Sequence, residues 1–246
     1  MNDLETLLVR ATEDPAARPG FYRALADNTL FVLTPMPMAE GDRTLEAGAH
    51  VEIVHWMDGD KQVTPIFSSL ERLDEAVRQV SEKYGYLGVR GRELFGILSQ
   101  ADVPAVLNPY WSHGRRFLPH EIARLAEGTF ADPSDTEVVE QERSVLVAQP
   151  REYPHGLVAA LRKCFSGAPK VAAAYLALYV DLKIGPEPRL VITIACTGAA
   201  RSIVQDAGVI AREIMNDGPA VDFVVIEEGA DAPLSGGSEP FYTRSR

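Results

Sequence analysis

Apolar and polar residues alternate along the first half of the chain with two different spacings. Apolar residues at helical spacing predict four helical regions: residues 4–26, 68–80, 91–100 and 119–126. Runs of β-branched and aromatic residues between turn signals predict four strands: residues 30–34, 50–56, 62–67 and 104–107. We therefore expect a sheet covered by helices.

Local signals predict where some of these elements begin and turn. Asp58-Gly59 predicts a hairpin between the second and third strands. Ser68 and Glu71 have the spacing of a capping box at the start of the helix that follows. Its apolar stripe is formed by Leu70, Leu73, Val77 and Val80.

The second half has longer apolar runs. They predict strands over residues 144–148, 170–181, 190–195 and 220–226, and helices over residues 154–165 and 202–215. Residues 171–180 are almost wholly apolar, as in a central strand that is covered on both faces. Residues 231–239 are rich in glycine and serine and predict a mobile loop.

A change in composition predicts a domain boundary. Residues 128–143 are rich in turn-forming and acidic residues, which is typical of a solvated linker. We predict two domains, residues 1–130 and residues 144–246. The fold class is α+β, with a mixed or largely antiparallel sheet flanked by helices in each domain.

Charge narrows the range of partners. Residues 1–145 contain 14 Lys and Arg against 24 Asp and Glu, and residues 146–246 contain 10 against 11. An acidic surface repels nucleic-acid phosphates and anionic membranes, so we expect neither as a partner. No apolar run reaches the length of a membrane span, and the first residues are acidic where a secretory signal is basic. We therefore expect a cytoplasmic protein with its two cysteines reduced.

Stretches along nearly the whole chain resemble one bacterial family. In the first half they are Phe31-Val32-Leu33-Thr34-Pro35, Pro65-Ile66-Phe67-Ser68-Ser69-Leu70-Glu71-Arg72, Leu107-Asn108-Pro109 and Glu121-Ile122-Ala123. The second half runs from Pro150-Arg151-Glu152-Tyr153-Pro154 to Pro240-Phe241-Tyr242. These stretches are similar to the N-terminal and C-terminal domains of the enhanced serine sensitivity (SseB) family. The family's name refers to a phenotype and implies no reaction.

The loop from Cys196 to Ser202 is the sharpest candidate for chemistry. It connects a predicted strand to a predicted helix, so Cys196 would face backbone N–H groups, a helix N-terminus and Arg201, which favour a thiolate or a bound anion. Cysteine, four residues and then Arg-Ser also resemble the active loop of rhodanese-type sulfurtransferases. The Asp-x-Arg and Gly-His-Ile-Pro-Gly-Ala features of those enzymes are absent, and the glycine lies one place early. An ordinary strand-to-helix connection is the simpler interpretation.

Two other segments are candidates for ligand or partner binding. Residues 108–116 combine aromatic and basic side chains, which could stack on a ring or clamp a phosphate, although a solvated hairpin tip is the simpler interpretation. The binding candidates in this loop are Tyr110, Trp111, Arg115 and Arg116. Phe241 and Tyr242 near the C-terminus must either dock on the core, which we favour, or contact a partner.

No motif predicts a metal or a nucleotide. The five histidines lack the spacing of metal ligands, and the chain has no Gly-x-Gly-x-x-Gly, Gly-Lys-Ser/Thr or Gly-x-Ser-x-Gly. We expect no cofactor. The first hypothesis is a non-enzymatic binding or regulatory protein whose partner is a protein or a small molecule, and which could form a homo-oligomer. The alternative is a thiolate enzyme that uses Cys196, Arg201 and Ser202.

Overall fold

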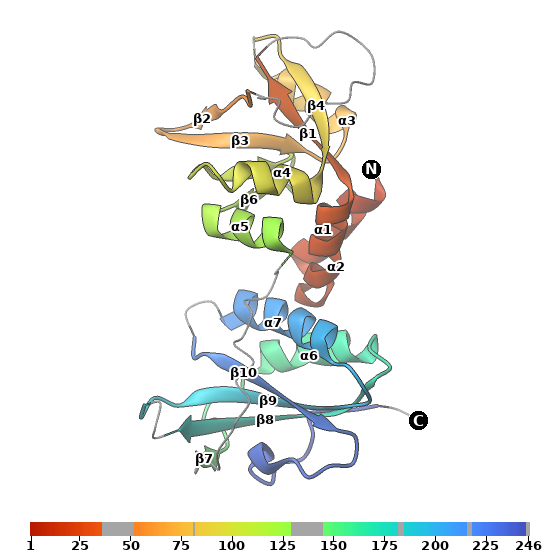
Figure 1. The fold of residues 1–246 in the computed structure, drawn as a ribbon, viewed down its shortest axis with the longest axis vertical. Coiled ribbons are helices and arrows are strands. Elements are labelled where there is room, and N and C mark those ends of the chain that lie inside the picture. The colour runs from red at the N-terminus through yellow and green to blue at the C-terminus, as the bar shows by residue number, and fades with distance from the viewer. Residues whose placement is uncertain (36–51, 81, 129–144, 182–184, 216–217, 245–246) are drawn as a thin grey trace. The chain divides into compact units, whose positions relative to one another are not determined.

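The computed structural model describes residues 1–35, 52–80, 82–128, 145–181, 185–215 and 218–244 (Figure 1). The chain forms two compact units. The N-terminal unit comprises Met1–Thr12 and Gly20–Thr129, and the C-terminal unit comprises Glu13–Pro19 and Phe130–Arg246. Each unit is α+β, as predicted. The predicted domain limits, at residues 130 and 144, lie outside the described residues and stay a prediction.

The N-terminal unit contains a mixed six-stranded sheet. Its strands are β1 (Thr29–Thr34), β2 (Trp56–Asp58), β3 (Lys61–Phe67), β4 (Gly85–Arg90), β5 (Ala105–Leu107) and β6 (Arg115–Phe117). The order is β4-β1-β3-β5-β6, and β2 pairs with β3. Among the strand pairs described for this sheet, only β3 and β5 run parallel, with Ile66 opposite Leu107. Their carboxyl ends therefore meet at one edge of the sheet.

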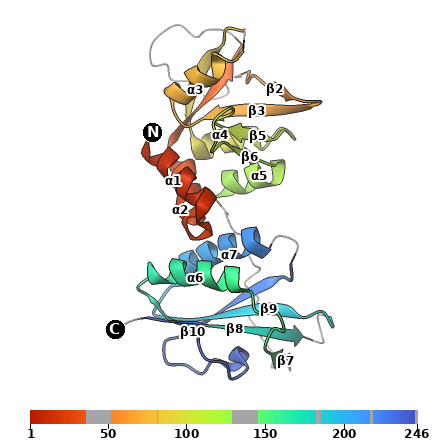
Figure 2. The ribbon, with the colours of Figure 1, turned by 180° about the vertical axis from the view of Figure 1, so that it is seen from behind.

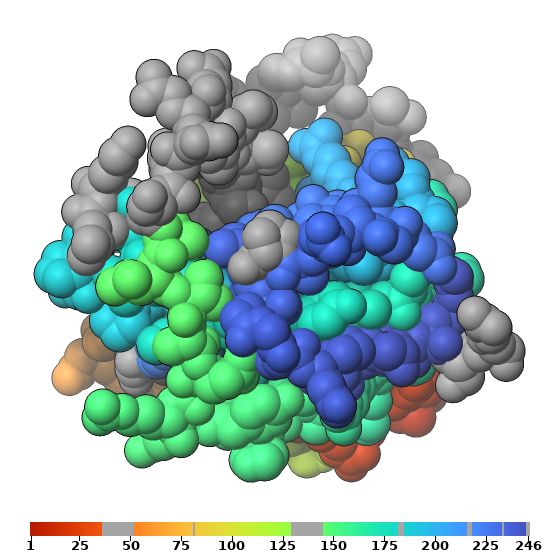
Figure 3. Space-filling view, turned by 90° about the horizontal axis from the view of Figure 1, so that it is seen from below, coloured from red at the N-terminus to blue at the C-terminus, as the bar shows by residue number. Residues whose placement is uncertain are grey.

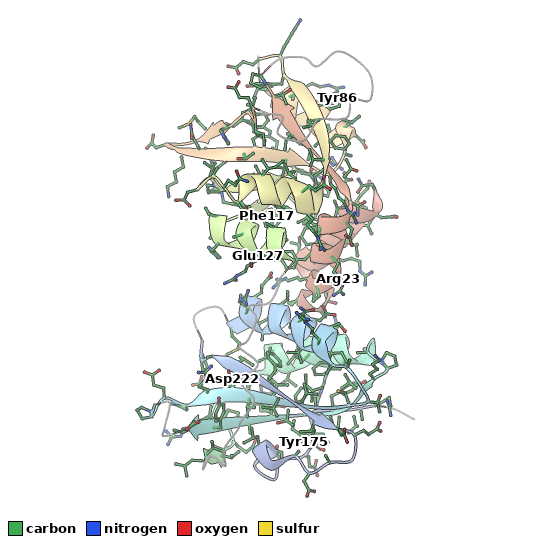
Figure 4. The ribbon with its side chains drawn as sticks, in the orientation of Figure 1. Arg23, Tyr86, Phe117, Glu127, Tyr175 and Asp222 are labelled. Carbon is green, nitrogen blue, oxygen red and sulfur yellow. The ribbon has the colours of Figure 1, made fainter. Side chains whose placement is uncertain are left out.

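Helices cover both faces of this sheet. They are α1 (Asp3–Glu13), α2 (Arg18–Asp27), α3 (Leu70–Val77), α4 (Gly91–Leu98) and α5 (Pro119–Glu127). Helix α3 lies on the opposite side of the sheet from α4 and α5 (Figure 2). Under α3, the fully buried Leu33 and Phe67 pack with Leu73 and Ala76. On the other face Phe117 of β6 contacts Phe95 of α4, with ring centroids 6.0 Å apart (Figure 4).

The C-terminal unit contains a mixed five-stranded sheet of order β10-β9-β8-β11, with β7 also paired to β8. The strands are β7 (Val145–Ala148), β8 (Val171–Asp181), β9 (Arg189–Cys196), β10 (Val221–Glu227) and β11 (Tyr242–Thr243). Helices α6 (His155–Ser166) and α7 (Arg201–Met215) cover one face. The segment after β10, which contains the short 3-10 helix η2 (Pro233–Ser235), crosses the other face beside β7 (Figure 3).

Most predicted elements are present, and the differences have local causes. The strand predicted over 50–56 begins only at Trp56 among the described residues, and β4 and β6 were not predicted. The helix cap is Ser69 rather than Ser68, because the Ser69 hydroxyl accepts the Arg72 N–H. The predicted stripe is also wrong at Leu70, which is exposed.

The segment predicted as a mobile loop is tied to the sheet. Ser235 is buried, and its carbonyl accepts hydrogen bonds from Gln149 and Ser238. The long strand β8 is central, as predicted, and this segment covers its second face.

The first prediction concerns two glycines of α4. A Cβ at Gly91 would lie 2.0 Å from the carbonyl oxygen of Leu25, whereas a Cβ at Gly96 would meet nothing within 4 Å. We expect Gly91→Ala to lower the free energy of unfolding by about 2 kcal/mol or more, because the backbone must move. Gly96→Ala should leave it unchanged or raise it by up to about 1 kcal/mol. Urea unfolding measures both, and equal effects would contradict the close packing at Gly91.

Candidate functional site

The carboxyl ends of β3 and β5 bring two polar residues together. Ser68 directly follows β3 and Asn108 directly follows β5, and both are buried. The Ser68 N–H donates to Asn108 Oδ1 over 2.9 Å, and Asn108 Nδ2 donates to Ser68 Oγ over 2.8 Å. In open sheets with parallel strands, ligands commonly bind beyond such carboxyl ends. This edge is therefore a candidate binding site.

A buried carboxylate occupies the inner side of this edge. Glu5 of α1 is 1% exposed and accepts hydrogen bonds from the hydroxyls of Ser68, over 2.9 Å, and Ser69, over 3.1 Å. Burial alone would raise the pKa of the Glu5 carboxyl. The two hydroxyls and the charge of Arg72 outweigh burial and hold this pKa below its usual value. Glu5 is therefore ionised at neutral pH.

Arg72 connects the buried carboxylate to the surface. Its Nε lies 3.4 Å from Glu5 Oε1, and its Nη1 lies 2.6 Å from Glu75 Oε2. The guanidinium carbon also lies 4.4 Å from the centre of the Trp111 ring. Arg72 is thus held by two carboxylates and one aromatic ring, which leaves little of its charge for a ligand.

The loop between β5 and β6 holds an unusual backbone. Asn108 and Tyr110 have φ angles of 51° and 67°, in the left-handed region that residues other than glycine rarely adopt. The buried hydrogen bonds of Asn108 fix the start of the loop. A Cβ at Gly114 would lie 2.7 Å from the Asn108 carbonyl oxygen, so the end of the loop packs closely against its start. Such strained positions are frequent at functional sites.

This loop presents Tyr110 to solvent. Tyr110 is 70% exposed, and its ring centroid lies 6.0 Å from that of Trp56 on β2. Trp56 also contacts Tyr84, just before β4, with centroids 6.4 Å apart. We call Trp56, Tyr84 and Tyr110 the Tyr110 surface.

The two other candidates in this loop have internal partners. Arg115 hydrogen-bonds Tyr22 and lies 3.5 Å from a Glu121 carboxylate oxygen. Arg116 lies 2.7 Å from a carboxylate oxygen of Asp58. The structure therefore places Tyr110 against Trp56, places Trp111 against Arg72, and pairs Arg115 and Arg116 with carboxylates.

The Cys196 loop has the predicted strand–loop–helix order, but the thiol is enclosed. Cys196 ends β9, is 3% exposed, and packs in the core of the C-terminal unit. Burial raises the pKa of the Cys196 thiol, and the charge of Lys170 opposes this shift without reversing it. Arg201 and Ser202 begin α7 and are exposed. A nucleophilic thiolate needs the opposite environment.

Phe241 and Tyr242 dock on the C-terminal unit. Phe241 is 7% exposed and stacks on Phe165, and the Tyr242 hydroxyl donates to the Phe165 carbonyl oxygen over 3.0 Å. Tyr242 also pairs with Ala174 as part of β11. Docking is the outcome that we favoured from the sequence. A partner contact by these residues stays a prediction.

A polar cluster that the sequence did not suggest crosses the C-terminal sheet. Arg189 contacts both carboxylate oxygens of Asp222, and the Tyr179 hydroxyl donates to Asp222 over 2.6 Å. Burial and Asp222 raise the pKa of Tyr179 to about 12, so this tyrosine is a neutral donor at pH 7. The three side chains pair with one another across neighbouring strands.

Neither a metal site nor a membrane span is evident in the described residues. No group of three His, Cys, Asp or Glu side chains within the described ranges could hold a metal ion. No helix of this part of the chain is long and apolar enough to cross a bilayer.

Comparison with known proteins shows the family. The SseB protein N-terminal domain matches residues 4–124, and the SseB protein C-terminal domain matches residues 139–244. The chain belongs to the SseB family. Protein SseB of Escherichia coli (strain K12) and Protein SseB of Shigella flexneri are each 29% identical over 248 residues, which cover 99% of this chain and 92% of the relative. No solved structure is significantly similar to the chain.

The second prediction concerns Glu5. We expect Glu5→Gln to lower the free energy of unfolding at pH 7 by about 1–3 kcal/mol, because Arg72 loses a buried charged partner. The ordinary pKa is 4.5 and the folded value is lower. The contribution of the carboxylate is therefore complete above about pH 4.5 and is lost as the pH falls through the folded pKa. The difference between wild type and variant should shrink in acid.

Urea unfolding at several pH values measures this difference. Glu75→Gln is the matched control, since Glu75 also contacts Arg72 but its side chain is 51% exposed. Its effect should stay below about 1 kcal/mol. A difference for Glu5→Gln that grows on acidification would contradict the assignment.

The third prediction concerns the two thiols. Cys196 is buried, whereas Cys164 is partly exposed. In the folded protein at pH 7.5, iodoacetamide should therefore alkylate Cys164 faster than Cys196, as measured by peptide mass spectrometry. In a Cys164→Ala background Cys196 should react slowly below pH 7. Rapid alkylation of Cys196 below pH 7 would support the thiolate hypothesis instead.

Proposed function

We propose that this SseB family member is a cytoplasmic binding protein whose Tyr110 surface contacts a partner protein. The exposed Tyr110 ring is the observation that carries the proposal, because a left-handed backbone and buried Asn108 hold it in place over Trp56. A large aromatic ring in solvent lacks the stabilising free energy that burial provides. A partner protein that covers the ring would supply that burial.

The framework under the surface supports this role. Asn108, Ser68 and Glu5 form a buried hydrogen-bonded chain from α1 to the loop. Side chains that are ordered before binding lose less conformational entropy when a partner arrives. Tyrosine, tryptophan and arginine are also the residues that contribute most to the centres of protein interfaces.

The charges around the surface favour binding over catalysis. Arg72, Arg115 and Arg116 each lie against a carboxylate. An anionic substrate would have to displace these carboxylates, and a general acid or base needs a shifted pKa in an open site. The thiolate alternative receives no comparable support, because Cys196 is buried with a raised pKa.

The fourth prediction tests this surface in the cells that produce the protein. Tyr110 is replaced by the photo-crosslinking residue p-benzoylphenylalanine, and illuminated complexes are identified by mass spectrometry. Tyr86 on β4 is the matched control site, because it is 48% exposed and its ring contacts Phe31 rather than Trp56 (Figure 4). We expect a defined protein adduct from position 110 that is absent from position 86.

Loss of that adduct when Trp56→Ala is added would connect the contact to the aromatic cluster. The Trp56→Ala protein must retain the unfolding profile of the parent. An absence of adducts at position 110, or identical adducts at both positions, would contradict the proposed surface.

A further inference from the structure

The three rings of the Tyr110 surface are joined through Trp56. Trp56 contacts Tyr110, with centroids 6.0 Å apart and planes at 42°, and Tyr84, with centroids 6.4 Å apart and planes at 48°. The rings are therefore inclined rather than stacked. Inclined aromatic rings with negative faces are the usual means of holding an ammonium or guanidinium group.

The same unit already uses this interaction internally. Arg72 lies 4.4 Å from the ring centre of Trp111, and Arg115 lies 5.0 Å from that of Tyr22. Within the described ranges, no cation lies over the rings of Trp56, Tyr84 or Tyr110. Lys83, the neighbouring cation in the sequence, is exposed.

A carboxylate increases the negative character of this cluster. The Tyr84 hydroxyl donates a hydrogen bond to Glu82, which is exposed. This bond polarises the phenol and brings a negative charge to the rim of the cluster. Burial and Glu82 raise the pKa of Tyr84, so the phenol remains a donor at neutral pH. The surrounding half of the chain, residues 1–145, carries 24 Asp and Glu against 14 Lys and Arg.

We propose that Trp56, Tyr84 and Tyr110 bind the cationic side chain of a lysine or arginine of the partner protein. This inference rests on the proposed function and names the chemistry that the Tyr110 surface recognises. The rings would contact the methylene groups and the charge together, and Glu82 would complete the charge complementarity.

The fifth prediction tests the charge with small probes at constant ionic strength. Nα-acetyl-lysine amide and Nα-acetyl-arginine amide are titrated against their neutral analogues, Nα-acetyl-norleucine amide and Nα-acetyl-citrulline amide. Trp56 and Trp111 are the two tryptophans of the chain, so Trp111→Phe leaves Trp56 as the single tryptophan, whose emission is excited selectively at long wavelength. The full chain labelled with 5-fluorotryptophan gives the same measurement by ¹⁹F NMR without any substitution.

We expect both cationic probes to bind about two- to fivefold more tightly than their neutral analogues. Tyr110→Ala and Glu82→Gln should each reduce this preference, and Tyr86→Ala should not. Tetramethylammonium chloride is the probe for a free small-molecule cation. It should bind no more tightly than the lysine probe, and binding more than about tenfold tighter would overturn the choice of a protein side chain.

Equal binding of cationic and neutral probes would overturn the inference, and so would a lack of measurable binding by every probe. Neither result would contradict the proposed function, because the cross-link from position 110 reports contact with a partner whatever the charge of the partner's side chain. Conversely, a preference for cationic probes without any cross-link would support a cation site and contradict the proposed protein partner.

Discussion

The buried Glu5 carboxylate is the interaction on which the N-terminal unit depends. It accepts from the hydroxyls of Ser68 and Ser69 and contacts Arg72, and so joins α1 to the end of β3 and the start of α3. Through Ser68 it is also connected to Asn108 and hence to the loop that carries Tyr110. A buried charge is tolerated only when it is paired and hydrogen-bonded in this way. The conformation of the surface loop therefore depends on these buried hydrogen bonds.

Sequence patterns predicted the elements better than the contacts between them. Helix α5 and the strand β8 follow directly from the Pro119 signal and from an apolar run. The strands β4 and β6 were missed because β4 contains two glycines and β6 is three residues long with two arginines. The cap of α3 was assigned one residue early because Ser68 and Ser69 look alike locally. Only the fold shows that the Ser68 hydroxyl donates a hydrogen bond to Glu5, which is 63 residues away in the sequence.

The sequence identified part of the candidate site, and it missed the contacts that only the fold creates. The mixture of aromatic and basic residues in 108–116 marked Tyr110, which lies on the surface that we propose, and Trp111, which contacts Arg72 instead. The pattern could not show that Arg115 and Arg116 would be neutralised by Glu121 and Asp58, or that Trp56 and Tyr84 would join the cluster. The contacts of Arg116 with Asp58 and of Trp56 with Tyr84 join residues that are distant in the sequence, and the Arg115–Glu121 contact depends on how α5 packs beside β6. The Cys196 loop is the converse case, since its order was predicted correctly while burial of the thiol depends on packing of the C-terminal core.

The most direct test of the account compares the affinity of two variants for the partner recovered through position 110. Isothermal titration calorimetry would measure the wild type, Tyr110→Ala and Cys196→Ser at one ionic strength. The account predicts that Tyr110→Ala raises the dissociation constant by about tenfold or more, because an exposed aromatic anchor is lost. Cys196→Ser should leave the dissociation constant unchanged. An unchanged affinity for Tyr110→Ala with a loss for a folded Cys196→Ser protein would contradict it.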